Sequence, residues 1–456
     1  MPELRPFRAL RFDSAAVGDL RDVVSPPYDV ISPERQRALA RRHPRNVVRL
    51  DLPLDEAGDP PDERYRRAAR DLATWRSDGT LRKDRQQSVY AYEQAYTSPG
   101  SHQACVQRGC FVLLRLEAFG PGSTVRPHER TLTAPKEDRY RLLRATAMNA
   151  SPVVLLFEDD GVEAGRALEA ACLLDPLADV TDDDGVRHRL WQLPIEDPVA
   201  GPIAEALLRA GSAGPLTIAD GHHRYETALR YRDERRRDRE HPDPEPFDYL
   251  LALLLPASQP LTILPTHRLL RDGIAGADLV RALEALFDVE RMPSREALLG
   301  EFAPGSGTRP PSAGRGAADP VVVDDDSGRP HRLGLWTAGT AAILHARRSS
   351  FEPLLDGSAS PALRWLDVNL LAIALERLAG IDRGATAGGS RVGYAIDARG
   401  AVDAVDRGEA AAAFLLDSTP VRAVLRVAAA GEVMPQKSTY FYPKQLTGLV
   451  LNPHEW

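Results

Sequence analysis

The sequence predicts a mixed α/β protein in which short strands and amphipathic helices alternate along most of the chain. Apolar runs typical of buried strands occur at residues 153–157 and 249–255, and residues 62–77 have the spacing of an amphipathic helix. The clearest unit is Leu216-Thr-Ile-Ala-Asp-Gly-His-His-Arg-Tyr-Glu-Thr-Ala-Leu229. There an apolar run ends at Asp220-Gly221 and a helical pattern begins at once, which predicts a strand, a tight turn and a helix.

The first motif of the chain is Val24-Ser-Pro-Pro-Tyr-Asp-Val-Ile-Ser-Pro-Glu34. The prolines favour an extended or turned backbone, and Ser32-Pro33-Glu34 has the pattern of a helix N-terminus, so a helix to about Arg42 is expected. Tyr28 and Asp29 then lie on a rigid turn, which is either an ordered loop or part of a site. Beyond it the pattern predicts a strand at 47–52, a helix at 62–77 and a hairpin of strands at 88–97 and 105–119.

A dense group of polar residues follows this hairpin. His128-Glu-Arg-Thr131 precedes Lys136-Glu-Asp-Arg139, which opens a predicted helix to Met148. One interpretation is a solvated, charged helix face with a structured loop before it. The other is a set of anion ligands, His128, Arg130 and Lys136, with Glu129 as a possible base.

The second half of the chain continues the alternation. Strands are expected at 153–157, near 179, and at 189–193, 249–255, 261–264, 333–336, 341–346 and 393–397; helices are expected at 162–173, 203–210, 362–378, 406–416 and 420–430. His267 and Arg268 lie at a predicted strand end, a common border of ligand clefts, although such a pair is often structural. The Gly- and Pro-rich stretch 303–317 predicts a linker between regions 1–302 and 318–456.

The turn at 220–224 has the composition of an anion-binding turn. N–H groups at a helix start and the helix dipole favour anions, and Gly221 permits close approach to the backbone. Arg224 carries two donors suited to a phosphate or carboxylate. In the alternative interpretation Asp220 caps the helix and the histidines are ordinary polar surface.

The C-terminal stretch Met434-Pro-Gln-Lys-Ser-Thr-Tyr-Phe-Tyr-Pro-Lys444 is the second prominent motif. Almost all of the basic residues are arginines, and the only lysines are Lys83, Lys136, Lys437 and Lys444. Lys437 beside Ser438 and Thr439 suits a phosphate or carboxylate, but the glycines of a phosphate loop are absent. The aromatic residues 440–442 either stack on a base or pack in the core.

Overall composition narrows the classes of function. The 456 residues carry a net charge of −7, which argues against a general nucleic-acid binder. No apolar run is long enough to span a membrane, no secretory signal is recognisable, and three cysteines form neither a disulfide framework nor a metal motif. A cytoplasmic protein is therefore expected.

These motifs together resemble a known family. Ser25-Pro-Pro-Tyr-Asp-Val30, His128-Glu-Arg-Thr131, Ala219-Asp-Gly-His-His-Arg-Tyr225 and the 434–444 segment look like successive signatures of the domain-of-unknown-function 1015 family. The central turn also resembles, more distantly, the phosphate-binding turn of the ParB/sulfiredoxin superfamily, which includes CTP-binding partition proteins and free-serine kinases. Sulfiredoxins have Gly-Cys-His-Arg there, whereas this chain has Gly221-His222-His223-Arg224, so peroxiredoxin repair is excluded.

The resemblance implies a ParB/sulfiredoxin-like nucleotide-binding core with large insertions and a C-terminal α/β domain. It implies contacts between nucleotide phosphates and Gly221, His222, His223 and Arg224. The function expected from it is a nucleotide-dependent phosphotransferase or phosphohydrolase acting on a small metabolite, possibly a free-serine kinase. The alternative is a non-catalytic nucleotide-binding regulator of the ParB type.

The expected roles follow from that function. The predicted ligands are ADP or ATP, possibly CTP, with Mg²⁺, and a small-molecule metabolite, while a metal ligand set and an oligomeric state cannot be assigned. The catalytic candidates are Asp220, His222, His223 and Glu129. The phosphate-binding candidates are Gly221, His222, His223, Arg224, His128, Arg130, Lys136, Lys437, Ser438 and Thr439; Tyr28, Asp29, His267 and Lys444 are further candidates.

Overall fold

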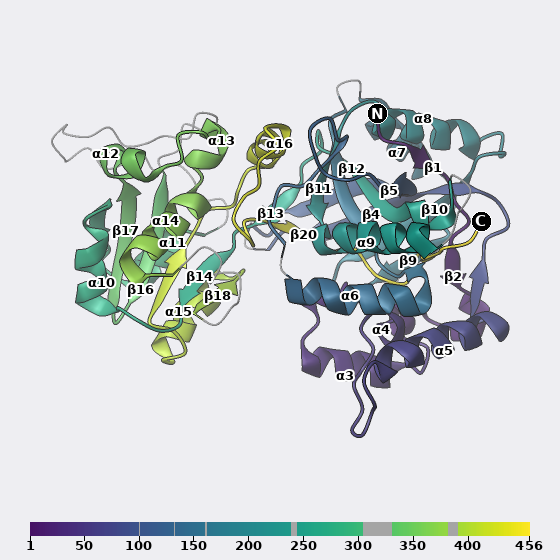
Figure 1. Cartoon of the computed structure of the whole chain (residues 1–456), viewed down its shortest axis with the longest axis horizontal. Coiled ribbons are helices and arrows are strands. Elements are labelled where there is room, and N and C mark those ends of the chain that lie inside the picture. Colours follow the sequence, from purple (N-terminus) through teal and green to yellow (C-terminus); the bar gives the residue numbers. More distant parts are fainter. Residues whose placement is uncertain (100, 132, 160–161, 239–243, 304–330, 382–390) are drawn as a thin grey trace.

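The computed structural model describes residues 1–456 except 100, 132, 160–161, 239–243, 304–330 and 382–390, and it has two lobes (Figure 1). The larger lobe is built on a nine-stranded mixed sheet, and the smaller lobe is built on a six-stranded sheet. The predicted mixed α/β class is confirmed. The ParB/sulfiredoxin-like core stays a prediction.

The nine-stranded sheet has the order β6-β11-β8-β12-β5-β4-β10-β9, with β1 paired to β5. In this sheet β12 pairs with β8 and β11 pairs with β6 in parallel, and the remaining strand pairs are antiparallel. The strands are β1 Leu4–Arg5, β4 Ser88–Thr97, β5 Ala104–Arg115, β6 Val125–Arg126, β8 Val153–Phe157, β9 Ala178–Thr181, β10 Arg187–Pro194, β11 Leu216–Asp220 and β12 Tyr249–Pro256.

Alternate residues of β12 enter two different apolar clusters, as the period of a strand requires. Ala252 and Leu254 pack with side chains of helices α6 (Thr133–Thr146), α7 (Glu163–Ala171), α8 (Ala200–Ser212) and α9 (His222–Asp238). Leu251 and Leu253 join the cluster that continues into the smaller lobe. The sheet is therefore buried on both faces, which explains the continuous apolar run that marks β12 in the sequence.

A layer of short elements covers the large lobe beyond α6 (Figure 1). It comprises α1 Ser14–Val17, α2 Leu20–Val23, α3 Pro33–Arg42, α4 Val48–Asp51, α5 Glu63–Ser77 and the pair β2 Leu10–Phe12 and β3 Leu81–Lys83. The strand predicted at 47–52 is wrong, because this segment forms α4. The Asn46 side chain, one residue before the N-cap Val47, accepts a 3.0 Å hydrogen bond from the Val48 amide, and such a local bond favours a turn over an extended strand.

The smaller lobe carries an antiparallel sheet in the order β15-β17-β16-β19-β14-β18. Its strands are β14 His267–Leu270, β15 Phe287–Arg291, β16 Arg332–Thr337, β17 Thr340–Ala346, β18 Val392–Ala395 and β19 Ala412–Leu415. Its helices are α10 Gly276–Leu283, α11 Arg295–Glu301, α12 Arg348–Phe351, α13 Pro361–Arg364, α14 Asp367–Ala379 and α15 Ala398–Asp406. The hairpin predicted around Gly339 is confirmed.

Two helix predictions in this lobe differ from the structure. The helix predicted at 406–416 is wrong, because α15 ends at Asp406 and Gly408, at φ +75°, turns the chain into the buried strand β19. The alanines of this segment favour a helix, and pairing with β14 and β16 overrides that preference. The helix predicted at 362–378 is divided into α13 and α14.

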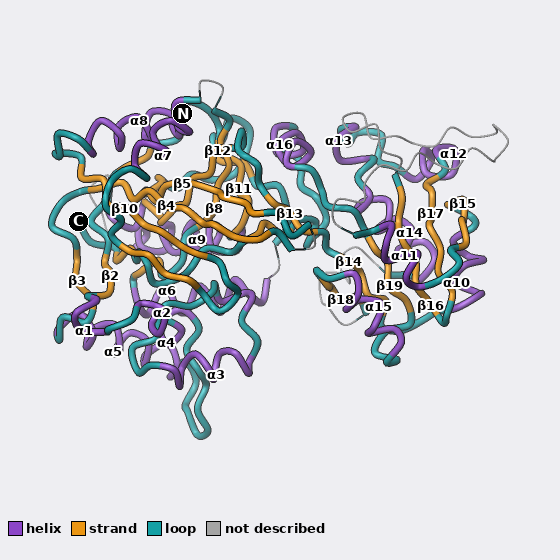
Figure 2. Tube along the Cα trace, turned by 180° about the vertical axis from the view of Figure 1, so that it is seen from behind, coloured by secondary structure: helices purple, strands orange, loops and turns teal. Residues whose placement is uncertain are grey.

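The chain crosses between the lobes twice. Strand β13 (Thr262–Leu264) leads into the smaller lobe, and β20 (Tyr440–Tyr442) returns beside it as its antiparallel partner. The chain then ends in the large lobe, where β21 (Asn452–Pro453) pairs with β7 (Met148–Asn149). Figure 2 shows this connection from behind.

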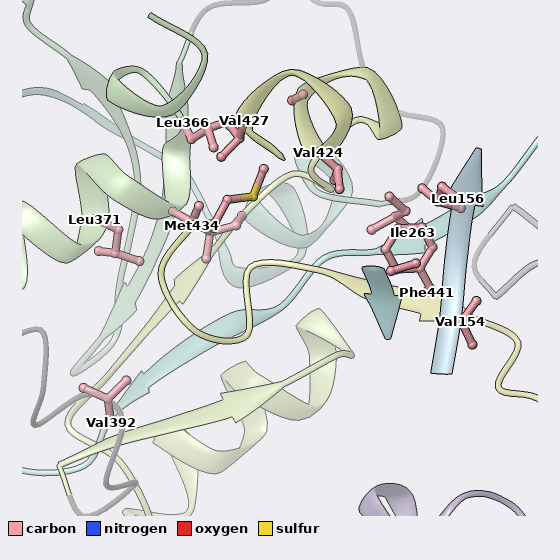
Figure 3. Close-up of a cluster of buried hydrophobic side chains, with 14 of the residues drawn as sticks. Val154, Leu156, Ile263, Leu366, Leu371, Val392, Val424, Val427, Met434 and Phe441 are labelled. Atoms are coloured by element: carbon pink, nitrogen blue, oxygen red, sulfur yellow. The ribbon is translucent and has the colours of Figure 1, made fainter. Parts of the chain in front are cut away.

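An apolar cluster fills the connection between the lobes (Figure 3). Val154 and Leu156 of the large sheet contribute to the same cluster as Ile263 of β13 and Phe441 of β20. It continues through Met434 and helix α16 (Val421–Ala429) to α14. The segment between α16 and β20, which holds the Lys437 motif, is thus packed against both lobes.

The predicted regions can be compared with these sheets. The boundary predicted at residue 302 falls just after α11, within the smaller lobe, whereas the sheets change near residue 265. The linker predicted at 303–317 lies, apart from residue 303, outside the described residues. No helix within the described ranges is long and apolar enough to cross a membrane.

Candidate functional site at the start of helix α9

The turn between β11 and α9 is shaped by Gly221. This residue has φ +93°, a conformation that side chains with a Cβ rarely adopt. A Cβ there would lie 3.0 Å from Nε of Arg224, whose side chain folds back over the turn. The glycine therefore allows Arg224, in the first turn of α9, to reach back to the end of β11.

Asp220 binds two cations from distant parts of the sequence. Its Oδ2 accepts a 2.5 Å hydrogen bond from Arg224, and its Oδ1 accepts one of 2.8 Å from Lys444. Burial acts to raise the pKa of Asp220, but Lys444 and Arg224 hold this pKa well below its usual range. The ammonium of Lys444 also lies 4.5 Å from the centre of the Tyr440 ring. Asp220 is thus a permanently ionised clamp that joins the turn to the C-terminal segment.

His128 and His222 form a buried pair beside this clamp. Their ring centres are 4.7 Å apart, and the backbone N–H of His128 donates to Nε2 of His222 at 3.3 Å. Nδ1 of His128 lies 2.5 Å from the carbonyl oxygen of Ile218, and Nε2 lies 2.9 Å from the hydroxyl of Thr439. Burial lowers the pKa of His128 to about 4 and holds that of His222 well below its usual value. Both rings are therefore neutral at physiological pH.

Glu129 binds the loop that carries Lys437. Its two carboxylate oxygens accept hydrogen bonds from the backbone amides of Lys437 (2.8 Å) and Ser438 (3.3 Å), and 15% of its side chain is exposed. Burial raises the pKa of Glu129, and these amides oppose that rise. Lys437 is exposed and has φ +57°.

The same loop is held from the smaller lobe. The carbonyl oxygen of Lys437 accepts hydrogen bonds from Thr266 and, at 3.0 Å, from the guanidinium of Arg268. Arg268 is buried and stacks 4.7 Å from the centre of the Tyr394 ring. The position of Lys437 therefore depends on groups from both lobes.

Further charged groups surround the first turn of α9. Lys136 pairs with Glu226, which also accepts a 2.8 Å hydrogen bond from Thr131. Burial, followed by the positive charge of Lys136, lowers the pKa of His223, and Lys437 contributes in the same direction. His223 thus lies within electrostatic reach of two lysines that are 301 residues apart in the sequence.

The opening motif lies on the other side of Arg224. Tyr28 and Asp29 belong to the short 3₁₀ helix Tyr28–Val30, and Asp29 is exposed. Against the effect of burial, the charge of Asp220 and then that of Asp29 raise the pKa values of Arg224 and Lys444. The guanidinium of Arg139 lies 4.1 Å from the centre of the Tyr28 ring. All four motifs are therefore brought together around Arg224.

Asp51 and Arg139 also line this region, and sequence reasoning did not single them out. Both are buried, and Arg139 donates to the backbone carbonyl of Asp51. They line a cavity of about 50 Å³ together with Arg224 and Thr227. Among the described residues, Asp51 Oδ2, Arg224 Nε and Thr227 Oγ1 have no hydrogen-bond partner. Asp51 lies in the segment 47–52, which the sequence pattern predicts as a strand. That prediction gave no reason to regard Asp51 as a site residue.

Two predicted residues are placed differently from the others. Arg130 is exposed, and its backbone N–H reaches the Met434 carbonyl at 3.4 Å. His267 lies in β14, where its Nδ1 accepts a 3.1 Å hydrogen bond from the Leu416 amide. Burial lowers the pKa of His267 to about 4. It therefore supports the smaller lobe, and its neighbour Arg268 is the residue that contacts the site.

Residues 4–369 match the family described as "Protein of unknown function (DUF1015)". The chain belongs to this family. The predicted membership is thus confirmed, and the Asp220 turn and the Glu129 region both fall within the matched part of this DUF1015 protein. No curated protein matches the sequence.

Solved structures similar to this DUF1015 protein have low sequence identity. A free serine kinase in complex with AMP has 12% identity and a TM-score of 0.36, with 73% of this chain and 86% of that chain covered. A conserved hypothetical protein from Pyrococcus furiosus has 12% identity and a TM-score of 0.34, with coverage of 73% and 90%. C-terminally truncated SbnI from Staphylococcus aureus has 9% identity and a TM-score of 0.34, with coverage of 72% and 83%.

Proposed function

We propose that the site binds the phosphates of a nucleotide and transfers or hydrolyses a phosphoryl group, with a small hydroxylated metabolite as the acceptor. The observation that supports this is the gathering of cations at the start of α9. Lys136 and Lys437 come from two distant segments and lie near His223 in the first turn of α9, which also carries Arg224. The first N–H groups of a helix have no intrahelical partners. Such a start favours a bound anion, and added cations strengthen that preference.

The cations have different parts in this proposal. Arg224 and Lys444 share the carboxylate of Asp220, so their charge is partly compensated and they hold the turn. Lys136 is paired with Glu226. Lys437 is exposed, and its backbone rather than its ammonium is bound by Glu129, Thr266 and Arg268. Lys437 is therefore the lysine best placed to meet a phosphate.

Phosphoryl transfer also needs a carboxylate that orients the nucleophile or binds Mg²⁺. Asp220 is clamped by two cations, and Glu129 is bound to two amides. Asp29 is exposed and faces the positive charge of Arg224 and Lys444. We assign this part to Asp29, which leaves Glu129 as a residue that positions Lys437.

A nucleotide-bound Mg²⁺ fits these residues. No group of three or more His, Cys, Asp or Glu residues in the described part of the chain could hold a metal ion. Mg²⁺ is usually held by one or two carboxylates together with substrate phosphates, so one carboxylate is sufficient. Asp29 would hold it, and the ion would neutralise charge on the transferred phosphoryl group.

One observation favours a second candidate, a non-catalytic nucleotide-binding regulator. The loop of Lys437 is bound by Glu129 from the large lobe and by Thr266 and Arg268 at the start of the smaller lobe. A ligand that contacts Lys437 therefore acts on a segment held by both lobes. In this alternative the nucleotide changes the relation between the lobes and is not consumed.

The first experiment is a thermal-shift titration with ADP, ATP, CTP and GTP, with and without Mg²⁺. A ligand that binds only the native state raises the melting temperature. We expect Lys437→Asn to reduce the shift, because it removes the ammonium and asparagine tolerates a positive φ. Arg377→Gln, which removes one charge from an exposed position on α14, is the matched control and keeps the shift.

The outcomes separate the two candidates. Nucleotide binding followed by formation of a phosphorylated product with serine as the first acceptor tested supports phosphoryl transfer. Binding without turnover of any nucleotide supports the regulator. If no nucleotide shifts the melting temperature of the wild-type protein, both candidates fail.

A further inference from the structure

The hydrogen bonds of His128 determine whether the hydroxyl of Thr439 donates or accepts a hydrogen bond. The carbonyl oxygen of Ile218, 2.5 Å from Nδ1 of His128, can only accept, so Nδ1 carries the proton. The ring is fully buried beside His222 and Phe441, with a carboxylate oxygen of Glu129 3.9 Å from Nε2, and burial keeps it neutral. A neutral ring with its proton on Nδ1 has none on Nε2. The 2.9 Å contact with Thr439 is therefore a hydrogen bond donated by the hydroxyl to Nε2.

The consequence is that Oγ1 of Thr439 has only lone pairs left to offer. A phosphate oxygen is an acceptor and gains nothing from this atom. The neighbouring Ser438 is also unable to donate, because its hydroxyl donates to the Pro435 carbonyl at 2.5 Å. The two hydroxyls, which the sequence suggested as phosphate ligands beside Lys437, thus have their protons engaged elsewhere.

The two hydroxyls differ in accessibility. Ser438 is 3% exposed, whereas Thr439 is half-buried. Thr439 is also close to the turn, because it contacts the imidazole of His128. That imidazole binds the Ile218 carbonyl, and the backbone N–H of His128 binds His222. An oxygen that only accepts is therefore linked to the start of α9 through a single residue, His128.

We propose that Thr439 is a specificity-determining residue whose Oγ1 accepts a hydrogen bond from a hydroxyl or ammonium group of the bound ligand. This inference rests on the proposed nucleotide site and deepens it. Two sources supply such a donor: a ribose hydroxyl of the nucleotide, or the hydroxyl or ammonium group of the phosphoryl acceptor. In both cases Thr439 favours a ligand that carries a hydrogen-bond donor next to its phosphates.

The test compares Thr439→Val, which keeps the shape and removes the oxygen, with Thr439→Ser, which restores it. Calorimetric titrations use ATP, 2′-deoxy-ATP and 3′-deoxy-ATP, and serine is titrated in the presence of a non-hydrolysable ATP analogue. A lost hydrogen bond of ordinary strength weakens binding about three- to tenfold. Thr97→Val, the same substitution at an exposed position at the end of β4, is the matched control.

The source of the donor follows from the pattern of losses. If the donor is a ribose hydroxyl, Thr439→Val weakens ATP but leaves one deoxy analogue unchanged, and Thr439→Ser restores the affinity. If the donor belongs to the acceptor, Thr439→Val leaves every nucleotide unchanged and weakens serine alone. A merely structural role would weaken all ligands equally, as a damaged loop does, so that result overturns the proposal.

The remaining outcomes are also decisive. If the wild-type protein binds nucleotide and Thr439→Val binds every ligand as tightly as Thr439→Ser, the assignment of Thr439 is wrong while the proposed function stands. If the wild-type protein binds no nucleotide, both are wrong. Should Thr439→Val fail to fold, Thr439→Ala replaces it, and the ratio of affinities for ATP and its deoxy analogues remains the readout.

Discussion

The carboxylate of Glu129 accepts a 2.8 Å hydrogen bond from the backbone amide of Lys437. A second bond of 3.3 Å from the amide of Ser438 completes the contact. Two peptide N–H groups directed at one carboxylate fix a loop more firmly than a single contact does, and bonds to a charged group are the stronger ones. A lysine held at φ +57° thereby keeps a defined place beside the start of α9.

Glu129→Gln distinguishes a positioning role from a base. The amide retains one oxygen to accept from Lys437, so we expect nucleotide affinity to fall only about two- to fivefold, in line with one weakened hydrogen bond. Glu129→Ala should lose about tenfold or more. The measurement is calorimetric titration with the tightest nucleotide of the screen. Complete loss of turnover in Glu129→Gln with unchanged nucleotide affinity would instead identify Glu129 as the base.

Replacing Lys444 by methionine should strongly destabilise the protein. The substitution removes one of the two cations that compensate the buried carboxylate of Asp220, and breaking a buried ion pair in this way costs about 3–5 kcal/mol. Arg281→Met is the matched control, because Arg281 pairs with Asp278 on the exposed face of α10 and its loss should cost about 1 kcal/mol or less. Urea unfolding measures both. Equal losses would mean that the clamp at Asp220 does not stabilise the fold.

The buried His128 predicts a loss of stability in mild acid. The folded pKa is about 4, whereas histidine in an unfolded chain has a pKa of about 6.5. Between these values the unfolded chain binds more protons, so the contribution of His128 is complete above about pH 6.5 and falls as the pH approaches 4. The largest loss is about 3 kcal/mol.

This pH dependence is measured by urea unfolding between about pH 7 and pH 4.5. His128→Asn, whose amide can still donate to the Ile218 carbonyl, should have a smaller loss of stability over this range than the wild type. His102→Asn, at an exposed position, should follow the wild type. If the stability of His128→Asn falls with pH as much as that of the wild type, protonation of His128 is not the cause of the loss.

Gly109 tests the packing of the large sheet. A Cβ at this position of β5 would lie 2.3 Å from the carbonyl oxygen of Leu254 and 2.6 Å from Leu255, so backbone must move. Gly109→Ala should therefore cost about 1–3 kcal/mol or more. Gly120→Ala meets no atom within 4 Å and should be nearly neutral. Thermal unfolding of the two variants provides the comparison, and a neutral Gly109→Ala would contradict the close approach of β5 and β12.

Local patterns were sufficient to predict most of the elements. The N-terminus of α3 at Ser32-Pro33 and the strand–turn–helix around Gly221 depend on residues close in sequence, and both were predicted correctly. Residues 47–52 and 406–416 were not, because a hydrogen bond between the Asn46 side chain and the Val48 amide, and pairing with β14 and β16, oppose the pattern of the segments themselves. These contacts lie outside the segment or across the sheet.

The candidate site was predictable in its residue types but not in its contacts. Unusual lysines and clustered polar residues identified the four motifs that meet around Arg224. The pairing of Lys444 with Asp220, the tautomer of His128 and the role of Arg268 depend on distances between segments far apart in the sequence. Nothing in the spacing of those residues could reveal which atoms face one another. Their assigned roles stay predictions until the binding experiments are made.

The return of the chain through β20 has a consequence for biosynthesis. Asp220 precedes Lys444 by 224 residues, and the whole smaller lobe is made between them. A ribosome therefore completes the large sheet's strands long before it supplies the ammonium that neutralises the turn. Until that moment the carboxylate of Asp220 has only Arg224 to compensate its charge. A nascent polypeptide that has not reached residue 444 therefore lacks one of the two cations of this clamp.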